Sequence, residues 1–475
     1  MNEYNKTFIY FICLISAMGG LLFGYDWVVI GGAKPFYELY FGIASSPLMQ
    51  GIAMSGALVG CLIGAMVAGT MADRYGRKPL LLCSAVLFTL SAVATGLFND
   101  FIMFNIARFV GGIGIGVASA LSPMYIAEMS PTAVRGRLVS LNQMTIVLGI
   151  LAAQVVNWLL ADEVPENSTQ ADILASWNGQ YGWRWMFWAE GVPAVLFMLL
   201  ATMIPESPRW QILKGKTDSA MRTLTSIGGA EYASSEARAV IEAAHAADAD
   251  VHADGAAATR GRGGRTELFS RKFSSVLLLG VVVAVFQQWC GTNVIFNYAQ
   301  EIFSAAGYSV GDVLFNIVIT GIANVVFTIV ALRTVDRWGR RSLMLFGAMG
   351  LAAIYAVLGL CYHFHITGFF MVLLVVAAIA CYAMSLGPVT WVLLSELFPT
   401  RVRGIAMSVC TFALWTGCTT LTFSFPSLNA AFGSDGTFWL YSLICAAGFI
   451  FFMRRLPETK GKSLEEIETM VTGKD

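Results

Sequence analysis

The chain carries the sequence EMSPTAVRG at residues 128–136, and the similar sequence ELFPTRVRG at residues 396–404. A second charged sequence, DRYGRK at residues 73–78, returns as DRWGRR at residues 336–341. The two repeats are spaced by 268 and 263 residues and occur in the same order. Charged signatures that recur at nearly one spacing indicate a duplicated structure, and a duplicated bundle of membrane helices is the usual plan of a secondary transporter.

The composition is that of a membrane protein. Of the 475 residues, 57% are hydrophobic and only 13% are charged, whereas a soluble protein carries about 25% charged residues. Apolar runs long enough to span a bilayer, ~20 residues, fall at roughly 7–33, 47–72, 79–98, 101–127, 134–161, 184–204, 274–303, 310–333, 342–362, 368–394, 402–424 and 437–455. The sequence therefore predicts an all-α membrane protein with twelve transmembrane helices in two pseudo-symmetric six-helix bundles.

The same pattern divides the chain into four parts. Residues 1–204 form an N-terminal six-helix bundle, 205–272 a cytoplasmic linker with short helices, 273–455 a C-terminal six-helix bundle and 456–475 a cytoplasmic tail. Within the linker, residues 209–245 have helical character. Residues 246–265 are rich in Ala, Asp, Gly and Arg, which predicts a flexible stretch.

The basic residues set the orientation. With both termini in the cytoplasm, all 30 Lys and Arg residues lie in cytoplasmic segments or at their helix ends, except Lys34, Arg184 and Arg108. The net charge is zero, so no nucleic-acid partner is implied. We expect a multi-pass protein of the plasma membrane, which is the inner membrane in a bacterium.

Three ionisable residues are predicted to lie deep in the apolar runs: Asp26, Arg108 and Glu190. Each lies six or seven residues from the outer end of its predicted helix, so at ~1.5 Å per residue all three lie at one depth. An unpaired charge at the centre of a bilayer costs ~2.5–3.5 kcal/mol or more. One cluster in the first bundle is therefore expected.

Two interpretations of this cluster stay open. In the first, Asp26 and Arg108 form a structural ion pair that holds two helices together. In the second, the cluster is a proton site, because an arginine favours the ionised form of a neighbouring carboxylate and its withdrawal favours proton uptake. Glu190 would tune or share that site.

Polar side chains near the predicted midplane indicate a substrate cavity. The run 274–303 contains Gln287, Gln288, Asn293, Asn297 and Tyr298, with Gly291 at a point where the helix can unwind. Further candidates in other runs are Asn324, Gln143, the Gly387–Pro388 interruption and Trp391. Neutral amides both donate and accept hydrogen bonds, which suits sugar hydroxyls, and interrupted helices are where transporters bind substrates. The alternative is amides that only bridge helices.

The sequence offers no signature of catalysis or of a bound cofactor or metal. The run GGIGIG at residues 111–116 lies inside an apolar run and follows no predicted strand. It is typical of close helix packing rather than of a nucleotide site. With no nucleophile–base constellation and no phosphate loop, an enzyme and an ATP-driven pump are both disfavoured.

The chain resembles the sugar porter family of the major facilitator superfamily over nearly its whole length. Within that family it is most similar to the bacterial xylose–proton symporters. The resemblance rests on these signatures, in this order: residues 73–78, Glu128 with Arg135 and Gly136, residues 205–210 (PESPRW), Gln287 and Gln288 with Gly291 and Asn293, residues 336–341, Glu396 with Arg403 and Gly404, and residues 457–461 (PETKG).

The resemblance implies a role for several residues. Asp26 matches the proton-carrying carboxylate of symporters, where passive members are neutral, and Arg108 and Glu190 match its coupling partners. The sugar contacts would be Phe23, Gln143, Gln287, Gln288, Asn293, Asn324, Gly387 and Trp391. The family is normally monomeric.

Three positions depart from the resemblance. Asn297 lies where members often have a tyrosine, and Ile150 and Leu414 lie where xylose symporters have sugar-contacting glutamines. A less polar cavity leaves a hexose such as glucose or galactose open beside xylose.

The repeated charged residues suit a cytoplasmic latch that pairs when that side is closed and separates when it opens. Its members are Asp73, Arg77, Glu128, Arg135, Glu206, Asp336, Arg340, Glu396 and Arg403. Asp73 could also face a helix N-terminus, where an anion is favoured. Simple positive-inside anchoring explains the basic residues but not the acidic ones.

The leading hypothesis is proton-coupled symport of a monosaccharide by alternating access. A passive sugar facilitator is the alternative, against which Asp26 argues. A transport-inactive sugar sensor is a third, disfavoured by the short segment that follows the last apolar run.

We expect Glu396→Gln to favour the state open to the cytoplasm, because it removes one charge of the latch. Labelling of cysteines placed on the cytoplasmic side should become faster. Unchanged labelling would contradict a latch role for Glu396.

Overall fold

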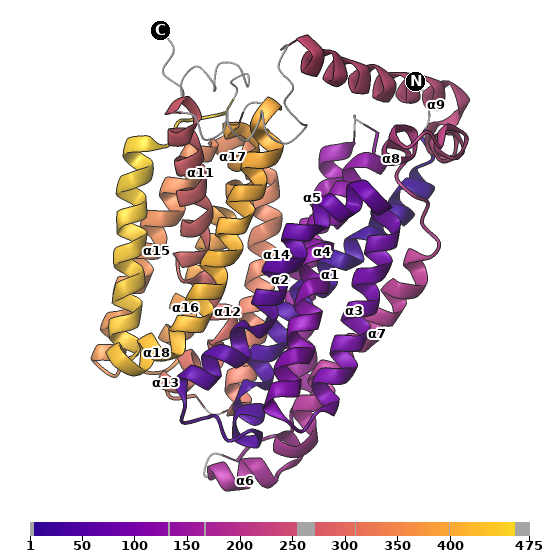
Figure 1. The fold of residues 1–475 in the computed structure, drawn as a ribbon. Helices are drawn as coiled ribbons and strands as arrows, with labels where there is room; N and C mark the ends of the chain where they lie inside the picture. Colours follow the sequence, from indigo (N-terminus) through magenta and orange to yellow (C-terminus); the bar gives the residue numbers. More distant parts are fainter. Residues whose placement is uncertain are drawn as a thin grey trace.

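The computed structural model describes residues 4–131, 134–165, 168–253, 271–308, 310–398 and 400–460. Within these ranges the regular elements are helical, and eleven segments are long and apolar enough to cross a membrane. Figure 1 shows two groups of long helices side by side, which we call the first half (α1–α7) and the second half (α11–α18).

The first half consists of six long helices and two short elements. They are α1 (Lys6–Tyr40), α2 (Pro47–Tyr75), α3 (Arg77–Leu97), α4 (Phe101–Met129), α5 (Arg135–Leu160), α6 (Gln170–Ala175), the π-helical turn η1 (Asn178–Gly182) and α7 (Trp183–Ala201). Polar side chains cap several N-termini. Ser46 accepts a hydrogen bond from the amide of Met49, and Asp100 accepts bonds from the first turn of α4. These bonds satisfy amides that have no intrahelical partner.

The second half contains more interruptions. Its elements are α11 (Arg271–Trp289), α12 (Thr292–Asn297), α13 (Ala299–Ala305), α14 (Val310–Trp338), α15 (Arg340–His363), α16 (Phe369–Met384), α17 (Leu386–Leu397) and α18 (Thr400–Arg455). The last of these holds two predicted spans. Its apolar segment Ile405–Arg455 has 51 residues, about 77 Å of helix, and Gly433, with a φ of 73°, turns the chain between the two spans.

Two breaks fall near the predicted cavity. Gly291 adopts a φ of 87° between α11 and α12, which confirms the expected unwinding. The tenth span breaks at Ser385, not at Gly387–Pro388. Pro388 lies in the first turn of α17, where a missing amide proton costs little.

Helix α1 is longer than the sequence predicts. The predicted end was residue 33, immediately before Lys34 and Pro35, but the helix continues to Tyr40. Phe36 and Tyr37 are fully buried, and this packing carries the helix through the proline. Asp26 therefore lies fourteen residues from the C-terminal end of α1 rather than seven, and Lys34 lies inside the helix.

The linker begins with α8 (Pro208–Leu213) and α9 (Thr217–Ala253), which is kinked at Gly228 and Gly229. Helix α9 contains residues 246–253, so this part of the predicted flexible stretch is helical. The remainder of that stretch, from 254 onwards, lies outside the described residues. Helices α8 and α9 lie at one end of the molecule, here called the near end, and α6 and α13 lie at the opposite, far end (Figure 1).

In the part of the chain that the structure describes, four pairs of helices make the main contacts between the two halves. Helix α2 packs against α18, α5 against α14, and α1 against both α12 and α13. Within the first half, α2 and α4 approach closely through glycines. A Cβ at Gly112 would lie 1.9 Å from the backbone oxygen of Ala57, and one at Gly116 would lie 2.2 Å from that of Cys61.

We expect Gly112→Ala to destabilise the protein by about 1–3 kcal/mol, because the added methyl group forces α2 and α4 apart. The matched control is Gly69→Ala on α2, where no atom lies within 4 Å of the new methyl group. Thermal unfolding in detergent should show a lower midpoint for Gly112→Ala alone. Equal midpoints would contradict the close approach.

Candidate functional site

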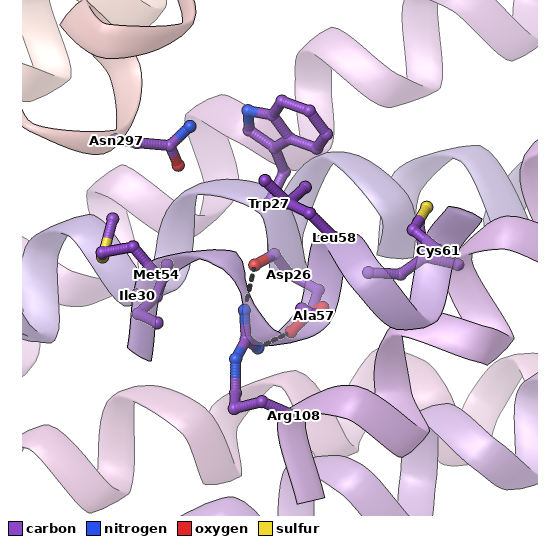
Figure 2. A pocket seen from close by; sticks show the side chains of 10 residues that line it. Asp26, Trp27, Ile30, Met54, Ala57, Leu58, Cys61, Arg108 and Asn297 are labelled. Atoms are coloured by element: carbon purple, nitrogen blue, oxygen red, sulfur yellow. Dashed lines mark hydrogen bonds and ion pairs between the residues drawn. The ribbon is translucent and has the colours of Figure 1, made fainter. Parts of the chain in front are cut away.

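The structure brings Asp26 of α1 and Arg108 of α4 into a buried ion pair. Each residue is only 2% exposed. A guanidinium NH₂ group of Arg108 also donates to the backbone oxygen of Asp26 at 3.2 Å, so the arginine holds both the side chain and the backbone of one residue. Figure 2 shows these two bonds side by side.

Glu190 of α7 completes the predicted cluster. Its side chain is 2% exposed and lies within the electrostatic range of both Asp26 and Arg108. The guanidinium also lies over the ring of Phe187, 5.4 Å from its centre. Two carboxylates facing one arginine leave one negative charge in excess, and burial makes such an uncompensated charge costly. One proton would remove it.

The ion pair faces a pocket that extends to the second half. Its lining includes Asp26, Trp27, Met54, Arg108, Ile115 and Asn297. Figure 2 shows Trp27 and Asn297 on the side of Asp26 away from Arg108. Asn297 belongs to α12, next to the predicted sugar contacts, so the predicted proton site and the predicted sugar site are adjacent.

The predicted amides of the second half form a chain around the Gly291 break. Gln288 donates to Gln287, Asn293 donates to Gln288, and the Asn297 side chain donates to the backbone oxygen of Asn293 at 3.1 Å. All four are buried. Because the amides are bonded chiefly to one another, sugar hydroxyls could replace these bonds without leaving polar groups unpaired.

The other predicted sugar contacts surround this chain less directly. Tyr298 is fully buried, and its hydroxyl donates to the backbone oxygen of Thr422 at 2.7 Å. Asn324 on α14 is buried, whereas Trp391 on α17 is 37% exposed. The half-buried positions are Phe23, Gln143 and Gly387. Their roles in sugar binding stay predictions.

An aromatic cluster crosses between the two halves beside the pocket. The rings of Phe23 and Trp27 on α1 lie 5.6 Å apart, and each lies 5.8 Å from Trp415 on α18. Neither Trp27 nor Trp415 was among the predicted site residues. The sequence could have indicated both tryptophans, because Trp27 directly follows Asp26 and Trp415 directly follows Leu414, and both preceding residues had been singled out. Aromatic faces suit the apolar face of a sugar ring.

A second buried ionic cluster was also missed. Lys34 is 1% exposed and pairs with Glu301 of α13, and it also pairs with Glu38 of its own helix at 2.9 Å. The three ionisable residues predicted to lie deep in the apolar runs are therefore not the only buried ones in the described part of the chain. Placing the end of α1 before Pro35 moved Lys34 into a loop, although Lys34 and Glu38 have the four-residue spacing of a helical ion pair.

At the near end, the first charged repeat forms one compact cluster. Arg77 pairs with Glu128 at 2.9 Å and with the exposed Asp73 at 3.4 Å. Glu206 accepts a hydrogen bond from the amide of Arg77 at 2.9 Å. Glu206, rather than Asp73, is therefore the anion at the N-terminus of α3. Arg135, at the start of α5, donates to the backbone oxygen of Ser130.

Among the described side chains, the second half repeats the central bonds of this cluster. Arg340 pairs with Glu396 at 3.0 Å, and Glu458 accepts from the amide of Arg340 at 3.0 Å. Ser207 donates to Glu128 as Thr459 donates to Glu396. The sequences PES at 205–207 and PET at 457–459 are thus a third repeat, 252 residues apart, which sequence analysis quoted but did not recognise. The side chains of Asp336 and Arg403 lie outside the described residues.

The ion pairs described for the latch residues therefore each join helices of one half. Arg77 and Glu128 are both in the first half, and Arg340 and Glu396 are both in the second. These pairs stabilise the near end of each half. A role in opening and closing stays a prediction.

Two helical halves of similar construction, with a buried ion pair and an amide cluster where they meet, define a membrane transporter of the two-bundle type. A family model described as "Sugar (and other) transporter" matches residues 12–471. The chain belongs to this sugar transporter family of the major facilitator superfamily.

Similar proteins carry three kinds of name. The chain is 36% identical to the D-xylose-proton symporter of Escherichia coli (strain K12), covering 99% of this chain and 97% of that protein. It is 34% identical to the arabinose-proton symporter of Bacillus subtilis (strain 168), covering 99% and 96%. It is 33% identical to the glucose facilitated diffusion protein of Zymomonas mobilis, covering 99% and 98%.

Solved structures confirm the fold class. The inward-open conformation of the xylose transporter XylE from E. coli superposes with a TM-score of 0.83 at 34% identity, covering 97% of this chain and 99% of that one. XylE bound to 6-bromo-6-deoxy-D-glucose gives 0.77 at 36% identity, covering 98% and 100%. The TM-score is therefore higher for the inward-open conformation than for the conformation bound to the sugar analogue.

Proposed function

We propose that this protein is a proton-coupled monosaccharide symporter that works by alternating access. The observation that carries the proposal is the buried Asp26–Arg108 pair, which faces a pocket reaching Asn297 of the other half. A carboxylate in this place can exchange a proton as the halves move, and the amide chain beside it supplies donors and acceptors for sugar hydroxyls. The proton and the sugar would then bind to adjacent parts of one interface.

The proposed cycle follows from the charges. While Asp26 is ionised, Arg108 compensates it and holds α1 against α4. Protonation removes the charge that Arg108 compensates, so α1 can move relative to α4. Glu190 provides a second carboxylate for the arginine, which would otherwise be left buried without a partner. Sugar binding across the two halves would select the protonated arrangement.

The orientation, boundaries and assembly belong to the same proposal. Both termini would lie in the cytoplasm, so that the near end is cytoplasmic and the far end external, in a bacterial inner membrane. The bundles would comprise residues 1–204 and 273–455, joined by 205–272 and followed by the tail 456–475. The transporting unit would be a monomer.

The identity of the sugar would depend on the two apolar positions at which xylose symporters have sugar-contacting glutamines. Ile150 and Leu414 are both buried, 9% and 4% exposed, and neither can bind a hydroxyl. The aromatic cluster of Phe23, Trp27 and Trp415 instead provides surface for the apolar face of a ring. Xylose, arabinose, glucose and galactose form the panel to be tested.

We expect Asp26→Asn to keep sugar counterflow in proteoliposomes but to lose accumulation driven by a pH gradient. The variant cannot ionise, so it cannot exchange a proton, whereas the sugar contacts remain. Retained counterflow also reports that the variant folds. The matched control is Asp172→Asn, a change of the same charge on an exposed helix at the far end, which should behave as wild type.

The opposite result would favour the passive facilitator. In that case wild type shows no gradient-driven accumulation, and Asp26→Asn exchanges sugar at the same rate. The Asp26–Arg108 pair would then be structural.

We expect Gln288→Ala to weaken sugar binding about tenfold, because it removes one neutral hydrogen-bonding side chain from the centre of the amide chain. The control is Gln300→Ala on α13, whose amide bonds to Ser304 instead. Titration calorimetry with each sugar of the panel provides the dissociation constants. Equal constants for both variants would contradict the proposed sugar site.

A further inference from the structure

Lys34 joins the two halves of the molecule toward the far end. Its ammonium group contacts Glu301 of α13, in the second half, although Lys34 belongs to α1 of the first half. Among the ion pairs whose two members are both described, this pair alone crosses between the halves. It lies eight residues beyond Asp26 along α1, about 12 Å along the helix axis.

Lys34 is tightly packed, whereas the side chain of its partner Glu301 is 26% exposed. Lys34 lies 5.4 Å from the centre of the Tyr298 ring, and both residues are buried. One turn before Lys34, a Cβ at Gly31 would lie 2.9 Å from the backbone oxygen of Asn297. The halves therefore touch at this level, and the low dielectric strengthens the attraction between Lys34 and Glu301.

Lys34 has a second partner that does not cross between the halves. Glu38 lies one turn further along α1, and its carboxylate is 2.9 Å from the ammonium group. If the far end opened by moving α13 away from α1, Glu301 would leave Lys34, whereas Glu38 would stay beside it. A lysine left alone in buried surroundings would oppose opening strongly, so Glu38 removes most of that barrier.

We propose that Lys34, Glu301 and Glu38 form a charge lock that controls opening at the far end. Glu301 is the partner that stabilises the closed far end, and Glu38 is the partner that makes the open far end accessible. The lock rests on the proposed alternating-access function. Its members are positioning residues, and its one contact with the predicted sugar contacts is that of Lys34 with the ring of Tyr298.

Glu301 lies close in the chain to the predicted sugar contacts, so sugar binding could change its position. Glu301 is carried by α13, which follows Tyr298 directly, and α12 with Asn293 and Asn297 precedes it. The Gly291 turn separates α12 from α11, and the break at Tyr298 separates α12 from α13. Because α12 leads directly into α13, a shift of α12 on sugar binding would be passed to Glu301 and would change its position relative to Lys34.

The lock predicts opposite effects for its two glutamates. Glu301→Gln removes the bond made only in the closed state, so the population with an open far end should rise about tenfold. Glu38→Gln removes the partner needed in the open state, so that population should fall. The control is Glu163→Gln, an exposed carboxylate at the far end, which should leave the population unchanged.

Distances between spin labels measure these populations directly. The labels are attached at Ser45→Cys and Thr367→Cys, exposed far-end positions in the α1–α2 and α15–α16 connections, after the exposed Cys83 is changed to Ser.

The charge-swapped protein Lys34→Glu with Glu301→Lys should return to the closed distance, because the lysine introduced on α13 would then face two carboxylates of α1. That rescue excludes a merely misfolded variant.

Two results would overturn the lock. The first is equal distances for Glu301→Gln and Glu163→Gln. The second is a shift of Glu38→Gln in the same direction as Glu301→Gln, which would make Glu38 one more bond of the closed state. The distances need no proton gradient, so a wild type that fails to accumulate sugar overturns symport and leaves this test intact.

Discussion

A charge inside the bilayer must have a partner within the protein, and this requirement organises the structure. Arg108 binds both the side chain and the backbone of Asp26, and Lys34 lies between two carboxylates. Neither positive charge could be moved from its site without another group taking over its role. Alternating access in such a protein is therefore an exchange of partners rather than a simple loss of contacts.

The two halves share their near-end clusters but differ in the middle of the membrane. Arg77 with Glu128 and Arg340 with Glu396 are equivalent pairs, each completed by a carboxylate at a helix N-terminus. Around the pocket, in contrast, the first half contributes the charged groups and the second half contributes most of the neutral amides. The duplicated part stabilises each half, and the part that differs carries the proposed functions.

Much of this arrangement could be predicted from the sequence, because long apolar runs and repeated charged motifs are strong signals. The pairing of Asp26 with Arg108 followed from the cost of burying charges. The position of Lys34 could not be predicted in this way, because Pro35 is an ordinary signal for a helix end and only the packing of Phe36 and Tyr37 overrides it. The exact break at Ser385 likewise depends on tertiary packing.

The equivalence of the two near-end clusters could not be predicted from the sequence for a different reason. A motif search matches residue types, and PESPRW and PETKGK share only their first two residues and a hydroxyl. Their equivalence became visible only through the bonds of Glu206 and Glu458 to the helices α3 and α15. Whether the latch residues take part in opening depends on motions between the halves, which residue spacing does not encode.

The position of Glu206 also has a consequence for the order of synthesis. The cluster that holds α2, α3 and α4 together needs a carboxylate that follows α7, so it cannot be completed until the ribosome has passed the sixth span. The equivalent cluster of the second half waits for Glu458, beyond the last span. Each bundle thus closes its near end only after all six of its helices have been made, which orders assembly into two successive stages.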